Sequence, residues 1–132
     1  MARDKSTTPT RAELEILRVL WAQGPATVRA VHGEVQQSRS TGYTTVLKLM
    51  QIMCEKGLVT RDESQRSHIY SAGISEEDVQ TVMTRDLMDR AFGGSASKLV
   101  MRALSAEGTS AAELDEIRSF LRSFGDDEGG RS

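Results

Sequence analysis

The stretch of sequence that decides the fold is STGYTTVLKLMQIMCEKG, residues 40–57. It opens with small hydroxyl residues, which favour helix starts, and it closes with Lys-Gly, which is typical of a helix end. Between them, apolar residues recur at the spacing of one helix face: Val46, Leu49, Met50 and Met53. The pattern predicts an amphipathic helix from about Thr41 to Lys56 with one buried face.

The opposite face of this helix avoids negative charge in its first half. It carries Thr44, Leu47, Lys48 and Gln51, and its one carboxylate, Glu55, comes near the far end. A solvated face would usually mix more Glu and Asp with its Lys, because opposite charges one turn apart are favourable. Methyl, hydroxyl, amide and ammonium groups match base edges and thymine methyls. The helix therefore suits entry into a DNA groove, although partial burial of an ordinary amphipathic helix explains it as well.

Two short β-type runs follow directly, LVTRD (residues 58–62) and HIYSA (residues 68–72), joined by the polar loop ESQRS. Their β-branched and aromatic residues predict a β-hairpin with a cation near its tip. A helix with an open face followed by such a hairpin is the plan of a winged helix. In that fold the recognition helix enters the major groove and the wing rests on the backbone or the adjacent minor groove.

Two more helices are expected upstream of this unit. Thr10-Arg11-Ala12-Glu13 has the form of a capping box, and the apolar stripe that follows ends at Gly24-Pro25. A second helix places Val28, Val31 and Val35 on one face. Ala26-Thr27 is a candidate third strand beside the hairpin. Residues 10–72 thus predict a complete small domain of three helices and a hairpin.

The C-terminal half predicts three amphipathic helices. Ser75 with three acids and the capping box at Ser110 mark two helix starts, and Gly93-Gly94 separates the first helix from the second. Three such helices within about fifty residues cannot easily cover one another, so a two-fold partner chain is the simplest remedy. The alternative is that they pack back on the winged helix of the same chain. The expected dimer interface is Val79, Met83, Leu87, Leu114, Ile117, Leu121 and Phe124.

Five segments resemble the penicillinase-repressor family of BlaI/MecI type, in the same order along the chain. They are residues 14–21, 26–32, 42–47, 55–59 and 91–100, and the resemblance covers roughly residues 8 to 124. It implies a dimeric winged-helix repressor that binds palindromic operator DNA. In characterised members, a membrane-bound sensor metalloprotease relieves repression by causing cleavage of the repressor.

The resemblance also implies a cleavage region in the short helix after Gly93-Gly94, at Met101, Arg102 and Ala103. Characterised members have an Asn-Phe pair where this chain has Arg102-Ala103.

The copper-responsive relatives carry a cysteine-rich metal motif near the C-terminus. The single cysteine of this chain, Cys54, lies in the expected recognition helix, where a small buried hydrophobe is the expected role.

The DNA-binding residues follow from the expected position of the recognition helix, whose first turns would enter the groove. The residues expected in the groove are Tyr43, Thr44, Leu47 and Lys48. The residues expected at phosphates or on the wing are Thr41, Thr45, Gln51, Arg61, Arg66, His68 and Arg11. By the resemblance, these positions correspond to the helix and wing contacts of the family.

The whole sequence predicts a mainly α chain with a small β-hairpin (α+β). We expect a flexible N-terminus (1–8), a winged helix-turn-helix DNA-binding domain (9–73), a helical dimerisation region (74–124) and a flexible acidic tail (125–132). Charge divides in the same way, although the formal net charge is only −2. Residues 1–70 hold ten Lys/Arg and seven Asp/Glu, whereas residues 71–132 hold seven and twelve. A basic half that meets phosphate and an acidic half that stays away from it fit this division.

Enzyme chemistry is not expected. His32 and His68 lie in different elements, and no nucleophile is paired with a local base, no phosphate-binding loop is present and no zinc-type cysteine pair occurs. We expect no cofactor. No apolar run could span a bilayer and no signal peptide is evident, so a cytoplasmic protein without membrane insertion is expected. Two alternatives remain open, a winged helix that docks proteins and a ligand-binding regulator.

Overall fold

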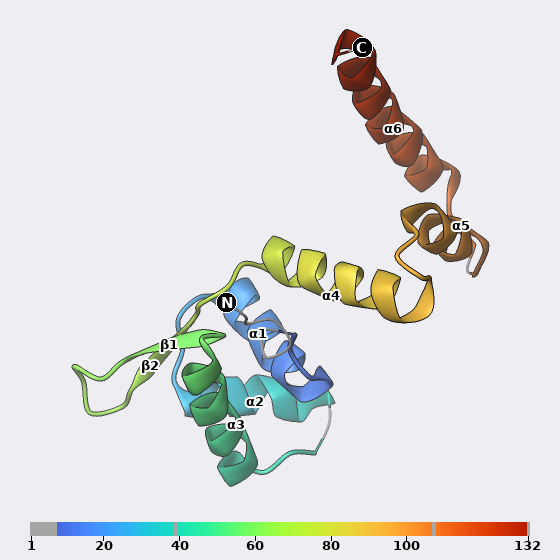
Figure 1. Ribbon diagram of the computed structural model, residues 1–132. Coiled ribbons are helices and arrows are strands. Elements are labelled where there is room, and N and C mark those ends of the chain that lie inside the picture. The colour runs from blue at the N-terminus through green and yellow to red at the C-terminus, as the bar shows by residue number, and fades with distance from the viewer. Residues whose placement is uncertain (1–7, 39, 107, 132) are drawn as a thin grey trace. The chain divides into compact units, whose positions relative to one another are not determined.

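The computed structural model describes residues 8–38, 40–106 and 108–131, with side chains through Gly125. Its elements are α1 (Arg11–Gln23), α2 (Val28–Ser38), α3 (Tyr43–Lys56), β1 (Val59–Asp62), β2 (Ile69–Ala72), α4 (Glu76–Ala91), α5 (Ala96–Ala106) and α6 (Ala111–Arg131), as Figure 1 shows. The predicted class, mainly α with one antiparallel hairpin, is confirmed. The flexible N-terminus expected over residues 1–8 lies, apart from Thr8, outside the described residues.

The chain divides into two compact units, one up to Asp86 and the other from Leu87 onward. The first unit holds a single hydrophobic core, built from one face each of α1, α2 and α3 together with the hairpin. Its buried side chains are Ile16, Leu17, Leu20, Val28, Val31, Val35, Val46, Met50, Met53, Leu58, Val59, Tyr70 and Val79. The apolar faces predicted from helical spacing for α2 and α3 are among them, with Leu49 only partly buried.

The predicted ends of α1 are confirmed. The hydroxyl of Thr10 accepts a hydrogen bond from the amide of Glu13 at 3.2 Å, and the amide of Thr10 donates to Glu13 Oε1 at 2.9 Å. Gly24 ends the helix at φ 87°, a backbone conformation that strongly favours glycine.

Helix α3 begins two residues later than the sequence predicted, at Tyr43. Its N-cap is Gly42, which has no side chain to cap the helix, and Thr41 stays outside the helix with its carbonyl bonded to His32. Thr41 was read as a start because hydroxyl residues favour caps, but that carbonyl bond holds it in the turn between α2 and α3. At the other end Gly57 adopts the left-handed conformation, as the Lys-Gly pair predicted.

The hairpin pairs Val59 with Ala72, and this register continues to Asp62 opposite Ile69. The predicted third strand is a single bridge: Ala26 and Tyr70 exchange backbone hydrogen bonds of 2.9 and 2.8 Å. This bridge ties the segment before α2 to the hairpin, so the start of α2 lies beside the wing.

The first part of α4 belongs to the first unit. Val79 is buried in its core, Met83 packs against that core, and the indole nitrogen of Trp21 donates to the carbonyl of Ile74 at 2.9 Å. Val79 is 1% exposed, so the expectation that it faces a partner chain is wrong. Met83, which was expected in the same interface, is partly buried against the core of its own chain. Helical spacing shows that a face is apolar but not what covers it. The boundary between the two compact units falls between Asp86 and Leu87, within α4, whereas the sequence analysis placed the start of the dimerisation region at residue 74.

The second unit contains the end of α4, α5 and α6. Gly93 and Gly94 break the helix with positive φ angles, and Ser95 and Ser110 cap the next two helices by accepting amide hydrogen bonds at 3.1 Å. None of the side chains described between residues 87 and 125 is buried.

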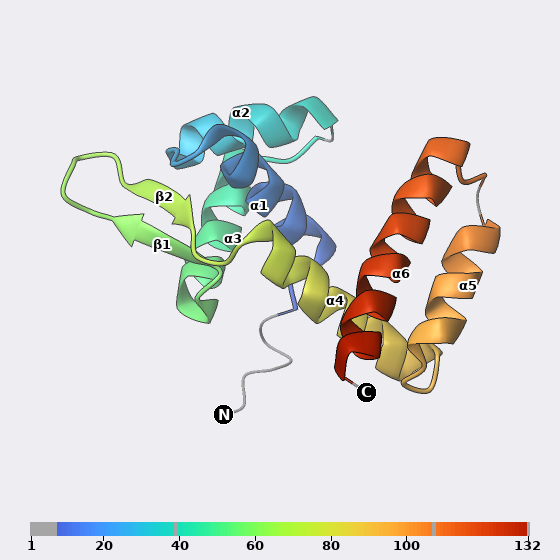
Figure 2. The same ribbon diagram turned by 90° about the horizontal axis from the view of Figure 1, so that it is seen from above.

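Helix α6 continues beyond Phe124, where the sequence predicted a tail, and reaches Arg131 as one uninterrupted helix (Figure 2). A glycine inside a helix costs only about 1 kcal/mol relative to alanine, and elongation of an existing helix can absorb that cost.

Among the described residues, no helix combines the length and apolar character needed to cross a membrane.

Candidate nucleic-acid interface

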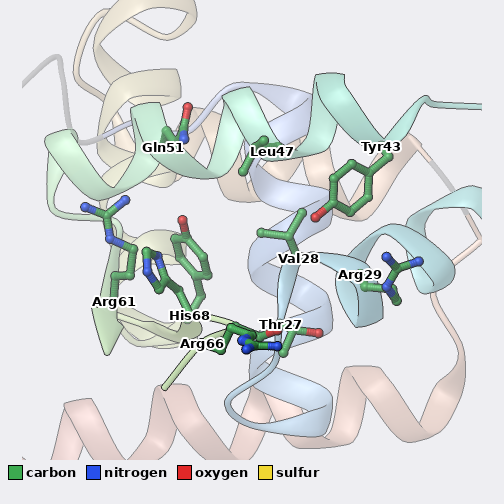
Figure 3. Close-up of a pocket in the computed structure, with 11 residues that line it drawn as sticks. Thr27, Val28, Arg29, Tyr43, Leu47, Gln51, Arg61, Arg66 and His68 are labelled. Atoms are coloured by element: carbon green, nitrogen blue, oxygen red, sulfur yellow. The ribbon is translucent and has the colours of Figure 1, made fainter. Parts of the chain in front are cut away.

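A concave surface of about 430 Å³ lies between α3, the start of α2 and the hairpin, and we refer to it as the α3–wing groove. Its lining residues are Thr27, Val28, Arg29, Tyr43, Leu47, Gln51, Arg61, Arg66, Ser67, His68 and Tyr70. Figure 3 shows Tyr43, Leu47 and Gln51 in succession along α3, with side chains of α2 and the wing opposite them. Three elements that are separate in the sequence thus contribute to one surface.

Six of the eleven residues predicted to bind DNA line this groove: Tyr43, Leu47, Gln51, Arg61, Arg66 and His68. Thr44 and Lys48 do not line it, but they are exposed on the outer face of α3 next to it. With Gln51 they follow the i, i+4, i+7 spacing of one helix face. The groove and this outer face together form one polar surface with little carboxylate.

The structure does not bring the remaining three predicted residues to the groove. Thr41 and Thr45 lie beside a different, largely apolar concavity of about 280 Å³ between α1, α2 and α3, which Leu49 also lines. Arg11 is the first residue of α1 and does not line the groove. Neighbouring helix residues are turned by about 100°, so Thr45 lies well away from the side of Gln51.

Sequence reasoning missed Thr27 and Arg29, both at the start of α2. The hydroxyl of Thr27 accepts from the amide of Ala30 at 3.2 Å, which caps α2 and places Arg29 in its first turn. The sequence prediction for this helix depended on its valine face alone, whereas Arg29 is exposed and lines the groove. A basic residue in the first turn, where it opposes the helix dipole, was the available signal.

The three arginines of the groove differ in their surroundings. Arg61 forms an ion pair with Glu63 at 2.7 Å, and hydrogen bonding to the Tyr70 side chain is the main cause that raises the pKa of Arg61. Within the part of the chain that the structure describes, no carboxylate lies within ion-pair distance of Arg29 or Arg66. Arg29 and Arg66 are therefore the cations of the groove that an external anion could neutralise without displacing a carboxylate.

Helix α3 is fixed at both ends by polar contacts with other helices. At its C-terminal end, Lys56 Nζ donates to Glu13 Oε2 at 2.8 Å, and Glu13 is only 2% exposed. The sequence identified Glu13 as a cap but gave no sign of its long-range partner. At the N-terminal end, the ring centroid of Tyr43 lies 5.8 Å from the guanidinium carbon of Arg29 and 5.9 Å from the ring centroid of His32.

The chemistry of this surface is that of binding. The groove presents guanidinium, amide and hydroxyl donors around the apolar side chains of Val28 and Leu47, and the outer face of α3 adds the ammonium group of Lys48. Among the described residues, no three His, Cys, Asp or Glu side chains gather where they could hold a metal ion. Cys54 is partly buried against the core, as expected for a small hydrophobe.

Comparison with known proteins gives a consistent result along most of the chain. The family model described as penicillinase repressor matches residues 9–123. The penicillinase repressor of Staphylococcus aureus is 21% identical over 118 residues, which is 89% of this chain and 94% of that protein. The transcriptional regulator BlaI of Mycobacterium tuberculosis is 28% identical over 110 residues, covering 83% and 79% of the two chains.

Two solved structures show the same fold. The DNA-binding domain of the repressor BlaI matches with a TM-score of 0.50 and 23% identity, over 57% of this chain and 92% of that domain. A MarR family transcription regulator matches with a TM-score of 0.51 and 22% identity, over 98% of this chain and 82% of that protein. The predicted winged-helix fold is thereby confirmed.

Proposed function

Because this chain belongs to the penicillinase-repressor family, we propose that it is a DNA-binding repressor that acts as a dimer on a palindromic operator. Members of the family are transcriptional repressors, not enzymes. One observation supports the proposal most: the α3–wing groove and the outer face of α3 form a continuous surface of donors and cations. Such a surface complements phosphates and base edges.

Base reading belongs to the outer face of α3. Thr44, Lys48 and Gln51 are all exposed there, and Lys and Gln side chains pair with guanine and adenine edges in the major groove. Leu47, half-buried at the edge of the groove, suits contact with thymine methyls.

Phosphate binding belongs to the wing. Arg66 lies at its tip, has no carboxylate partner among the described residues and lines the groove beside His68. A guanidinium in this place neutralises backbone phosphate whatever the sequence, and it sets the register of the protein on the duplex.

The second unit supplies the dimer contacts in this proposal. Leu87, Leu121 and Phe124 are each about half exposed, and Leu114 and Ile117 are partly exposed beside them on α6. A two-fold partner would bury these side chains and place two winged helices on two half-sites, which mirrors an operator palindrome.

Release of the operator follows in this proposal from a sensor protease acting on the repressor in the cytoplasm. Met101, Arg102 and Ala103 are exposed in the middle of α5. A protease binds its substrate in an extended form, so α5 has to open locally before the chain is cut. A cut there detaches α6 and its apolar side chains, and operator affinity falls because the two half-sites no longer act together.

The base and phosphate assignments are tested by binding to the DNA upstream of the gene and to a scrambled duplex over a range of salt. Lys48→Ala and Leu47→Ala should each reduce the preference for the operator by about 1–3 kcal/mol at the affected base pairs. Arg66→Ala should weaken both duplexes alike and reduce the salt slope by about one unit. Arg118→Ala, an exposed arginine of α6, is the matched control.

A change of base preference in Arg66→Ala together with none in Lys48→Ala would reverse these assignments. Release by proteolysis is tested separately by following the intact chain on an immunoblot during induction. A repressor that stays full-length throughout derepression would exclude cleavage.

The alternative of a protein-docking winged helix has less support. Such a surface needs a contiguous apolar patch. Among the described residues of the first unit, the only large hydrophobic side chains classed as exposed are Tyr43 at 41% and Ile52 at 37%. Tyr43 is moreover covered in part by Arg29 and His32.

A further inference from the structure

The first turn of α3 lacks the side-chain cap that usually fixes a helix start. Gly42 occupies the N-cap in an extended conformation, and no side chain bonds the free amides there. The first hydrogen bond of the helix, from the amide of Val46 to the carbonyl of Gly42, is 3.2 Å long. Something other than a cap must hold this turn, which carries Tyr43 and Thr44.

His32 of α2 provides two contacts at this point. Its Nε2 lies 2.8 Å from the carbonyl oxygen of Thr41, and because a carbonyl only accepts, Nε2 carries the hydrogen and donates it. The same ring packs nearly perpendicular to the ring of Tyr43, with centroids 5.9 Å apart and an interplanar angle of 84°. This edge-to-face arrangement is the favourable one for two aromatic rings.

A cation also lies near the ring of Tyr43. Arg29 lies one helical turn before His32 on α2, and its guanidinium carbon is 5.8 Å from the centroid of Tyr43. A guanidinium at this distance from a tyrosine ring is attracted by it. Tyr43 therefore connects the orientation of the first turn of α3 with the orientation of a groove arginine.

We propose that His32 is a positioning residue for DNA recognition, which sets the orientation of the first turn of α3 and, through Tyr43, that of Arg29. His32 does not line the groove, so it acts on DNA through Thr41 and Tyr43. Hydrogen bonds to base edges weaken steeply when their angles change, and binding sites need support that holds them to about 0.5 Å. Loss of His32 thus reduces discrimination more than total affinity.

This inference rests on the proposed function, and its test compares four variants with the wild type on operator and scrambled DNA. His32→Ala removes both contacts, His32→Gln keeps an amide donor for Thr41, and His32→Phe keeps only an aromatic ring beside Tyr43. Gln36→Ala, on the exposed part of the same helix, is the matched control. All four are compared well below their unfolding temperatures.

We expect His32→Ala to lose about tenfold in operator affinity, the size of one lost base contact, with a smaller loss on scrambled DNA. His32→Gln should recover part of the operator preference, and Gln36→Ala should match the wild type. Equal losses of His32→Ala on the two duplexes would overturn the inference, because a merely structural role lowers both.

Hydrogen exchange separates this inference from the proposed function. In His32→Ala the amide of Val46 should exchange faster, while amides in the second half of α3, which Lys56 and Glu13 fix, stay protected. Unchanged exchange at Val46 would overturn the positioning role even if operator binding fell. A wild-type chain that binds no DNA would overturn the proposed function and leave the exchange result to decide the role of His32.

Discussion

The two units of the chain contain helices with similar apolar patterns, but the apolar faces are buried in the first unit and exposed in the second. Among the residues that the structure describes, every buried hydrophobic side chain lies between Ile16 and Val79, in the first unit. In the second unit Met101, Phe120, Leu121 and Phe124 are each more than half exposed. The first unit therefore has a hydrophobic core of its own, whereas the second presents exposed apolar side chains, which in our proposal a partner chain covers.

The largest expected effect comes from making the second unit unable to associate. Ile117→Asp with Leu121→Asp places two charges on the apolar face of α6, which would cost several kcal/mol in a dry interface. Sedimentation should then show a monomer, and operator affinity should fall by about 10²-fold or more because bivalent binding is lost. Circular dichroism should show the winged helix still folded.

The matched control adds the same charge to the opposite face of the same helix. Ser119→Asp with Ser123→Asp should leave the protein dimeric, because both serines are exposed and lie about half a turn from the apolar face. A dimer in both double mutants would mean that α6 does not form the interface.

The second effect tests where the division between the units falls within α4. Val79→Ala should lower the free energy of unfolding by about 2 kcal/mol, since it removes two buried methyl groups and leaves a cavity. Leu87→Ala changes a residue of the same helix that is 49% exposed. In a monomeric variant it should change the free energy of unfolding by less than about 0.5 kcal/mol. Urea denaturation of the two variants in the Ile117→Asp, Leu121→Asp background provides the measurement. Equal losses in the free energy of unfolding would mean that the boundary between the two units does not lie between Val79 and Leu87.

The same contrast explains how much of the fold could be predicted. Helical spacing identified the buried face of α2 and most of the buried face of α3. The apolar faces of these helices pack together in one core. Spacing could not separate Val79 from Leu87, since both lie on apolar positions of α4 and only the folded structure shows that Val79 joins the core while Leu87 is exposed. Local patterns show that a face is apolar, and tertiary contacts decide what covers it.

The candidate site shows the same limit. Residues on α3 and the wing could be found because they follow one another in the sequence. Arg29 and the pair of Glu13 with Lys56 could not, since each depends on two helices that meet only in the folded chain. The helix start was misplaced for a related reason: the carbonyl of Thr41 is bonded to His32, which no cap rule includes.

A third, smaller effect concerns the tight packing at the end of the hairpin. A Cβ added at Gly73 would lie 2.8 Å from the carbonyl oxygen of Gly57, which is backbone and cannot move freely. Gly73→Ala should therefore destabilise the first unit by about 1–3 kcal/mol, as measured by urea denaturation.

Gly33→Ala is the informative control for this prediction. Gly33 lies within α2, and a Cβ there meets nothing within 4 Å. Alanine is the better helix former, so this substitution should stabilise the same unit by up to about 1 kcal/mol. Shifts of the same sign in the two variants would contradict the close backbone approach at Gly73.

The smallest effect lies at the outer edge of the first unit, where the wing is ordered by local polar contacts instead of by a core. The amide of Ser64 donates to Asp62 Oδ1 at 2.9 Å, and this bond, with a further one from the Ser64 side chain, lowers the pKa of Asp62. A lowered pKa in the folded chain means that the contribution of Asp62 is present above the ordinary aspartate value of about 4. It is lost as the pH falls through the lowered value.

The Ser64 amide signal in an NMR titration should therefore shift with a midpoint below that ordinary value. Asp62→Asn keeps an acceptor oxygen but cannot titrate, so it should remove this transition and leave the rest of the wing unchanged. A midpoint at or above the ordinary aspartate value would show that the turn does not hold the carboxylate in solution.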